Sequence, residues 1–179
     1  MRMILMAFLA FGLLAMAKSS PAADKPLVTV ASVDLERYMG KWYEIAAFPQ
    51  SFEKGCHCTM AEYSMTEKGY VRVLNTCRKD SPDGKPKTAE GKAFVVKGSN
   101  NAKLRVQFFW PFRGDYWIID LADDYSYAVV GAPGRNYLWI LSRTSEMDPV
   151  LYQQIVDRTA AKGFDVSKLR KTDQTCAGK

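Results

Sequence analysis

Residues 42–48 read WYEIAAF, a short apolar and aromatic run that is followed by seven more runs of similar length as far as Arg143. Each run is rich in aromatic and β-branched residues, and residues such as Gly, Asn, Asp and Pro interrupt the series at regular intervals, which is typical of strands joined by turns. We predict strands at 42–48, 56–65, 70–78, 90–97, 103–109, 115–121, 125–131 and 137–143.

The spacing of these runs leaves no room for helices between them, so the strands pair in an antiparallel sheet that closes into a barrel or folds into a sandwich. Only one segment has helical periodicity. Asp148 and Pro149 are favourable first residues for a helix, apolar residues recur at helical spacing, and Gly163 ends the pattern. We predict one helix at 149–162, with a single apolar stripe that packs against the sheet.

The N-terminus has the features of an export signal. Arg2 precedes an almost entirely apolar run at residues 4–15, and Ala15-Met16-Ala17 has the small-x-small pattern of a cleavage site. The run is shorter than the ~20 residues that cross a bilayer. We therefore expect a signal peptide at 1–17, an N-terminal extension at 18–32 and one domain at 33–179, with the product periplasmic or secreted.

The four cysteines all lie in the exported part of the chain, where thiols oxidise, and an even number favours two disulfides. If the turn after residue 65 is centred on residues 67–68, Cys58 lies opposite Cys77, which leaves Cys56 for Cys176. The swapped pairing, Cys56–Cys77 with Cys58–Cys176, requires a shift of two residues and stays open. A metal site is disfavoured, because one residue between two cysteines is too few for zinc and His57 is the only histidine.

Three segments resemble the signatures of the lipocalin family, in the family's order. Gly40-Lys41-Trp42 matches the Gly-x-Trp of the first, residues 123–127 resemble the second and residues 137–143 the third. The nearest subgroup is the bacterial lipocalins, which are similar to apolipoprotein D and to plant temperature-induced lipocalins. Many of its members are lipoproteins, whereas this chain has no cysteine near the predicted cleavage point, so we expect a protein without a lipid anchor.

The resemblance implies an all-β fold, an eight-stranded antiparallel up-and-down barrel with one end closed, one end open and a C-terminal helix packed outside. It assigns Gly40, Trp42 and Arg143 to the closed end, where the arginine packs over the indole ring, a contact that contributes ~0.5–2 kcal/mol. Asp124 and Tyr125 are expected to organise the turn before residue 127. These five residues are predicted to be structural.

The resemblance also implies a ligand cavity, since an eight-stranded barrel is wide enough for one small ligand. Both faces of several strands are apolar, so alternation alone does not identify the inward face. With Trp42 facing inward, the candidate lining residues are Ala46, Phe48, Tyr63, Phe108, Tyr116, Ile118, Tyr127, Val129 and Trp139. Arg113, in the loop after residue 109, is the candidate contact for an anionic head group.

The favoured function is therefore a carrier of fatty acids or lysophospholipids, without a cofactor or metal, with peripheral contact at a membrane surface as a further expectation. Three alternatives stay open. An enzyme of this fold by one route needs a free reactive cysteine near a base. The second alternative is a haem or pigment carrier, of which haem usually needs an axial ligand. The third is a protein-interaction scaffold with a filled barrel. The formal net charge of +6 is too small and too dispersed to indicate nucleic acid.

Overall fold

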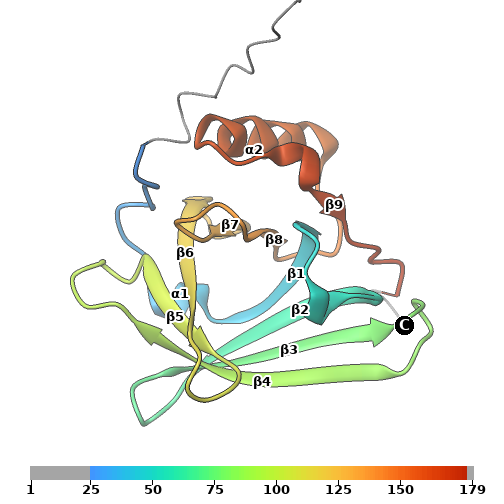
Figure 1. Ribbon diagram of the computed structural model, residues 1–179, viewed down its shortest axis with the longest axis horizontal. Coiled ribbons are helices and arrows are strands. Elements are labelled where there is room, and N and C mark those ends of the chain that lie inside the picture. Colours follow the sequence, from blue (N-terminus) through green and yellow to red (C-terminus); the bar gives the residue numbers. More distant parts are fainter. Residues whose placement is uncertain (1–24, 177–179) are drawn as a thin grey trace, which may run out of the picture.

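The computed structural model describes residues 25–176, which form a closed barrel with one long helix on its outside (Figure 1). The predicted fold is confirmed: eight strands form an antiparallel up-and-down barrel, and a ninth short strand pairs outside it. The strands are β1 (Gly40–Ala47), β2 (Cys56–Met65), β3 (Val71–Lys79), β4 (Pro86–Val95), β5 (Lys103–Gln107), β6 (Gly114–Leu121), β7 (Tyr127–Gly131), β8 (Leu138–Ser142) and β9 (Arg170–Lys171). The helices are α1 (Leu35–Tyr38), η1 (Ser51–Glu53), α2 (Pro149–Ala161) and η2 (Val166–Lys168).

The predicted signal peptide, residues 1–17, lies outside the described residues, as does the first part of the expected extension. The later part of that extension packs on the barrel. Leu27 is buried, and the backbone N–H of Val30 donates to the carbonyl of Ile118 on β6.

Helix α2 forms as its sequence predicts. The Asp148 side chain accepts hydrogen bonds from the backbone N–H groups of Val150 and Leu151, both at 2.9 Å, which satisfies donors that the helix itself leaves free. Ile155 and Thr159 are its buried residues. They face the outer wall of the barrel, where α2 lies across β7 and β8 (Figure 1).

The hydrophobic residues accordingly form two clusters. One lies inside the barrel and includes Trp42, Val71, Leu104, Ile118 and Val130. The other lies between the barrel wall and α2 and contains Ile45, Ile119, Leu138, Ile140 and Ile155. Alternate residues along a strand therefore serve different cores, which explains why both faces of several strands are apolar in sequence.

The first and second strands of the barrel, β1 and β2, pair with each other over only part of their length. β1 pairs directly with β2 only through residues 40–43 and 60–63. Further along, the C-terminal segment lies between these two strands. β9 pairs with Ala46 and Ala47 of β1, and on its other side the carbonyl of Asp173 accepts a 2.7 Å hydrogen bond from the N–H of Cys58.

The preferred disulfide pairing, Cys58–Cys77 with Cys56–Cys176, is wrong. The structure has Cys56–Cys77 and Cys58–Cys176, with Cα separations of 5.4 and 6.1 Å. The reason is a register shift in β2 between His57 and Met60, where Cys58 has a positive φ of 51°. This bulge turns Cys58 towards the C-terminal segment and leaves Cys56 on the face of Cys77.

Candidate ligand-binding site

The closed end of the barrel is held by Arg143. Its guanidinium lies 3.7 Å from the centroid of the Trp42 ring and donates hydrogen bonds to the carbonyls of Lys41 (2.9 Å) and Arg37 (2.6 Å). The Trp42 indole N–H donates to the carbonyl of Tyr38. A side chain at Gly40 would meet Arg143, and the φ of +92° at Gly40 is one that other residues rarely adopt. This end of the barrel is thus covered by packed side chains and hydrogen-bonded backbone.

The turn between β6 and β7 covers the same end. Asp124 accepts a 2.9 Å hydrogen bond from the N–H of Ser126, which lowers the pKa of its carboxyl. Tyr125 has a φ of 64°, and its hydroxyl accepts a hydrogen bond from the N–H of Asp34 just before α1. The turn is therefore tied to the segment that precedes β1.

The hydroxyl groups of three tyrosines lie together inside the barrel, next to its closed end. The hydroxyl of Tyr116 lies 2.8 Å from that of Tyr38 and 2.9 Å from that of Tyr63. Burial of these hydroxyls raises all three pKa values, that of Tyr63 to about 12. The group remains neutral at physiological pH and pairs its polar atoms internally, so it gives the deep interior an uncharged lining.

The residues of the inner cluster differ in how much of their surface is exposed. Trp42, Ile118 and Val130 have no exposed surface, whereas Val106, Phe108 and Trp139, which pack against the same cluster, keep part of theirs. These three residues lie on the half of the barrel away from Arg143. Of the predicted lining residues, the structure brings together Tyr63, Phe108, Tyr116, Ile118 and Trp139 in this cluster.

The other four predicted lining residues face outward. Ala46, Phe48 and Val129 belong to the cluster under α2, and Tyr127 packs against that cluster, where its hydroxyl accepts a hydrogen bond from Arg158 on α2. For β1 the cause is a register shift between Glu44 and Ala46, which reverses the alternation that begins at Trp42. For β7 the neighbouring Ala128 and Val130 supply the inward face.

Two carboxyl groups lie at the open end. Glu44 is buried on β1, and its Oε1 accepts a short hydrogen bond from the hydroxyl of Thr172 in the C-terminal segment. Glu53 comes from η1 in the β1–β2 loop and accepts a 3.3 Å hydrogen bond from the indole N–H of Trp139. Burial raises the pKa of both, and repulsion from Glu53 helps to raise that of Glu44 to about 8.

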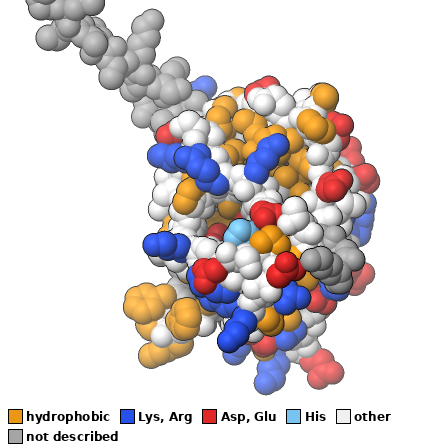
Figure 2. All heavy atoms as spheres, turned by 90° about the vertical axis from the view of Figure 1, so that its right-hand side faces the viewer, with side chains coloured by type: hydrophobic (Ala, Val, Ile, Leu, Met, Phe, Trp, Pro, Cys, Tyr) orange, Lys and Arg blue, Asp and Glu red, His pale blue; other side chains and the backbone are white. Residues whose placement is uncertain are grey.

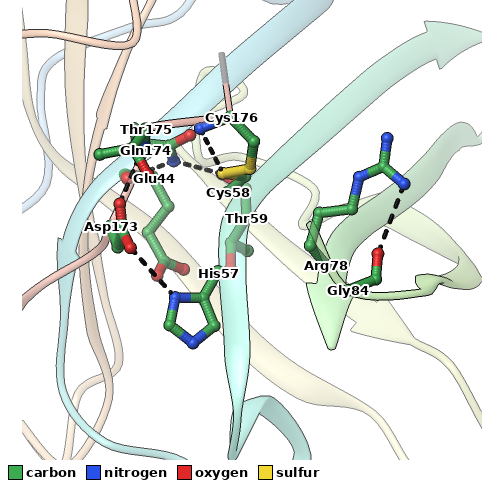
Figure 3. Close-up of a disulfide and its surroundings, with 10 residues drawn as sticks. All are labelled: Glu44, His57, Cys58, Thr59, Arg78, Gly84, Asp173, Gln174, Thr175 and Cys176. Atoms are coloured by element: carbon green, nitrogen blue, oxygen red, sulfur yellow. Dashed lines mark hydrogen bonds and ion pairs between the residues drawn. A yellow bond between two sulfur atoms is a disulfide. The ribbon is translucent and has the colours of Figure 1, made fainter. Parts of the chain in front are cut away.

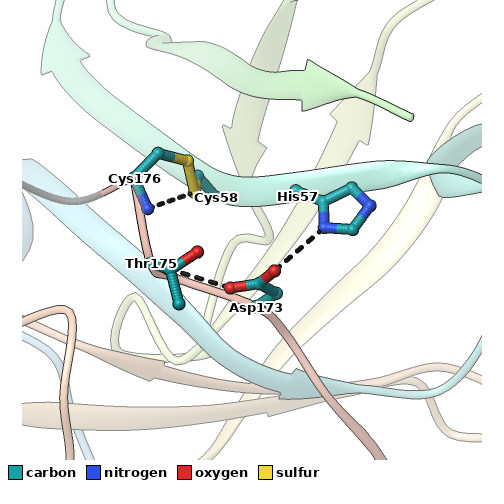
Figure 4. A network of polar contacts seen from close by, with 5 residues as sticks. All are labelled: His57, Cys58, Asp173, Thr175 and Cys176. Atoms are coloured by element: carbon teal, nitrogen blue, oxygen red, sulfur yellow. Dashed lines mark hydrogen bonds and ion pairs between the residues drawn. A yellow bond between two sulfur atoms is a disulfide. The ribbon is translucent and has the colours of Figure 1, made fainter. Parts of the chain in front are cut away.

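Both carboxyl groups border a cavity of about 490 Å³ between the β1–β2 loop and the C-terminal segment. Figure 3 shows Glu44 beside Asp173 and Gln174, with the Cys58–Cys176 disulfide next to them. The Gln174 side chain donates to the carbonyls of Glu44 and Thr59, both at 2.8 Å. His57 contacts Asp173 at 3.3 Å on the same rim (Figure 4), so the one histidine lies at the mouth and not deep in the barrel.

Arg113 is exposed outside the cavity. Its guanidinium lies 4.4 Å from the centroid of the Phe94 ring. Phe94 precedes Val95 on β4 and is adjacent in sequence to the inward-facing Ala93, so it belongs to the outer wall. Arg113 therefore lies against the outside of the barrel, and a contact with a head group inside the mouth requires its side chain to move.

Several residues of this region were not identified from the sequence. Val106 and Ala61 border the interior, and Glu44, Glu53 and Thr172 surround the mouth. Glu44 shares the alternation of Trp42 and so was detectable as an inward acid. Glu53 and Thr172 were not detectable, because they come from a loop and from a segment whose course over the barrel has no local sequence signal.

All four cysteines of the chain are in disulfides, so the thiol that an enzyme of this kind needs is not free. Within residues 25–176, no group of three His, Cys, Asp or Glu side chains is arranged to hold a metal ion. The same residues contain no helix of the length and apolarity that crossing a bilayer demands.

An eight-stranded antiparallel barrel of this kind has an interior that either is filled by its own side chains or holds one small ligand. Residues 33–174 match the family model described as a lipocalin-like domain, and the chain belongs to the lipocalin family, which binds small hydrophobic ligands.

Similar curated proteins agree with this assignment. The chain is 41% identical to temperature-induced lipocalin-1 of Arabidopsis thaliana over 160 residues, which cover 84% of each chain. It is 40% identical to the outer membrane lipoprotein Blc of Escherichia coli, with 87% of each covered, and 39% identical to mouse apolipoprotein D, with 79% of this chain and 77% of the relative covered. Among solved structures, insecticyanin from the tobacco hornworm superposes with a TM-score of 0.68 at 22% identity, over 86% of this chain and 87% of that one, which supports the fold.

Proposed function

We propose that the protein carries a single-chain acyl lipid, a fatty acid or a lysophospholipid, inside the barrel, and that it does so as a soluble protein of the periplasm or the extracellular space. The observation that carries the proposal is the difference in side-chain exposure inside the barrel. The floor is packed without exposed surface at Trp42 and Ile118, while Val106, Phe108 and Trp139 keep accessible apolar surface above it.

An acyl chain fits this arrangement because its affinity comes from burial of methylene groups, each worth about 0.8 kcal/mol. The tyrosine hydroxyls below the open region pair with one another, so they do not demand a polar partner from the ligand. The polar end of the ligand would lie at the mouth, where Lys54, Lys171 and Gln50 are among the residues that border the cavity.

The proposal is tested by placing a larger side chain inside the barrel, where the acyl chain would lie. Val106→Trp places a large ring in the open region, and we expect the affinity for oleate and for an oleoyl lysophospholipid to fall about tenfold or more, which is a loss of roughly 1.4 kcal/mol. Isothermal titration calorimetry measures both affinities. Val150→Trp, at an exposed position of α2, is the matched control and should bind as the unmodified protein does.

Urea denaturation of Val106→Trp establishes that the variant folds. If it does not, Ala61→Leu, a smaller addition to the same cluster, replaces it. Unchanged affinity in a folded lumen-filling variant would mean that the ligand binds elsewhere and would refute the proposal.

A further inference from the structure

The loop between β5 and β6 carries an unusual concentration of exposed aromatic rings. Phe109, Trp110 and Phe112 are 78%, 86% and 77% exposed, and no other large hydrophobic side chain in residues 25–176 exceeds 68%. Figure 2 shows a group of hydrophobic side chains protruding at the lower left of the molecule. Single exposed hydrophobic residues are ordinary, but adjacent ones on one turn indicate an interaction site.

The loop has a defined shape. The N–H of Phe112 donates a 2.9 Å hydrogen bond to the carbonyl of Phe109, so the chain turns back between the two rings. On either side, β5 and β6 pair from Val106 and Gly114 onward. Phe108, the residue before the tip, packs against the interior cluster. The three tip rings therefore project from a fixed base and belong to neither hydrophobic core.

The wall beside the loop is rich in cations. Arg113 lies over the Phe94 ring, and Lys92, two residues earlier on β4, lies 5.2 Å from the centroid of the Tyr70 ring. Two other arginines of this wall are in ion pairs, Arg105 with Asp115 at 3.7 Å and Arg72 with Glu90 at 2.6 Å. The surroundings of the aromatic tip thus have a positive balance.

We propose that this loop inserts its three rings into the interfacial layer of a lipid bilayer, with Lys92 and Arg113 against anionic head groups. Trp and Phe are favoured at the boundary between head groups and acyl chains, and cations near them add electrostatic attraction. A second copy of this chain is a poorer partner, because a symmetric contact would bring two positive surfaces together. The inference deepens the proposed function, since the loop belongs to the open end and its insertion brings the mouth to a source of acyl lipids.

The experiment measures flotation of the intact protein with vesicles of phosphatidylcholine alone and with phosphatidylglycerol added. In the variant Phe109→Ser/Trp110→Ser/Phe112→Ser, we expect binding to both vesicles to fall about tenfold or more, since apolar insertion supplies much of the affinity. The control is Val28→Ser/Met65→Ser/Val150→Ser, which removes three exposed hydrophobic side chains elsewhere and should bind as the unmodified protein does.

Lys92→Gln/Arg113→Gln tests the charge. We expect its affinity for the vesicles that contain phosphatidylglycerol to fall by about fivefold for each cation removed, while its affinity for phosphatidylcholine alone is unchanged. A blue shift of Trp110 fluorescence on adding vesicles would report insertion directly, and the Trp110→Ser variant identifies its origin.

Absence of vesicle binding by the unmodified protein would overturn the proposal, as would an equal loss in the control. So would sedimentation velocity that shows the unmodified protein as a dimer and the loop variant as a monomer, because the tip would then bind a second copy. Oleate titration separates this outcome from a failure of the proposed function: the loop variant should keep its oleate affinity, and a protein that binds oleate but not vesicles refutes only the docking.

Discussion

At the scale of single residues, Glu44 is the most informative side chain of the mouth. Its carboxyl is buried, accepts a hydrogen bond from Thr172 and faces Glu53, and its pKa is raised from the ordinary value of 4.5 to about 8. Between these two values the folded protein binds more protons than the unfolded chain, so the free energy of unfolding decreases as the pH rises through this range.

Glu44→Gln removes this titration. We expect the free energy of unfolding of the variant to depend less on pH than that of the unmodified protein. The difference in this free energy, variant minus unmodified protein, should become more positive by ~1–3 kcal/mol between pH 5 and pH 8. Urea denaturation at a series of pH values measures the difference. Glu90→Gln is the control, because that carboxyl is exposed and its partner Arg72 lowers its pKa. Parallel stability curves for Glu44→Gln and the unmodified protein would contradict the assignment.

Individual residues were also where prediction from sequence failed. The cysteine count predicted two disulfides, but the pairing depends on a bulge that gives Cys58 a positive φ. The alternation from Trp42 led to Ala46 and Phe48, and a second register shift after Glu44 turned both outward. A bulge adds one residue to one strand, so the residues beyond it face the opposite side from the one that alternation predicts. Because a bulge has no unique sequence signal, these reversals could not be predicted.

At the scale of elements, the C-terminal segment acts as a partial strand that completes the barrel where β1 and β2 separate. Its contacts are β9 with Ala46 and Ala47, and Asp173 with Cys58, and the Cys58–Cys176 disulfide holds its end. The Cys58–Cys176 disulfide joins residues that are 118 positions apart in the sequence, whereas Cys56 and Cys77 are 21 positions apart. A longer loop restricts the unfolded chain more.

We expect Cys58→Ser/Cys176→Ser to lose ~2–5 kcal/mol of stability, about 1–2 kcal/mol more than Cys56→Ser/Cys77→Ser. Native-state hydrogen exchange should accelerate at residues 170–175 in the first variant and remain slow there in the second. Faster exchange of this segment in both variants, or in neither, would show that the disulfide does not hold it.

Most strands were predicted to within two residues, because apolar runs and turn residues are local signals. β4 begins four residues earlier than expected, at Pro86. Residues 86–90 are exposed and contain no large apolar side chain, so they give no strand signal, yet they pair with β3. β9 has only two residues, both charged, so its position results from tertiary contacts and not from local preference. α2 was predicted almost completely because its first residues and its apolar stripe are both local.

At the scale of the whole molecule, the fold separates two cores, one inside the barrel and one beneath α2. The family resemblance and the barrel were predicted from three ordered segments of sequence. The division of residues between the cores was not, because it depends on the registers of all eight strands together.

The central claim is that this interior holds an acyl lipid, and native mass spectrometry of the protein isolated from its own cell envelope tests it most directly. We predict a mass increment of near one ligand per chain, which lipid extraction identifies as a fatty acid or a lysophospholipid. A protein that is found bare, and that takes up neither oleate nor an oleoyl lysophospholipid when these are added, would contradict the account and would favour a barrel that serves as a scaffold.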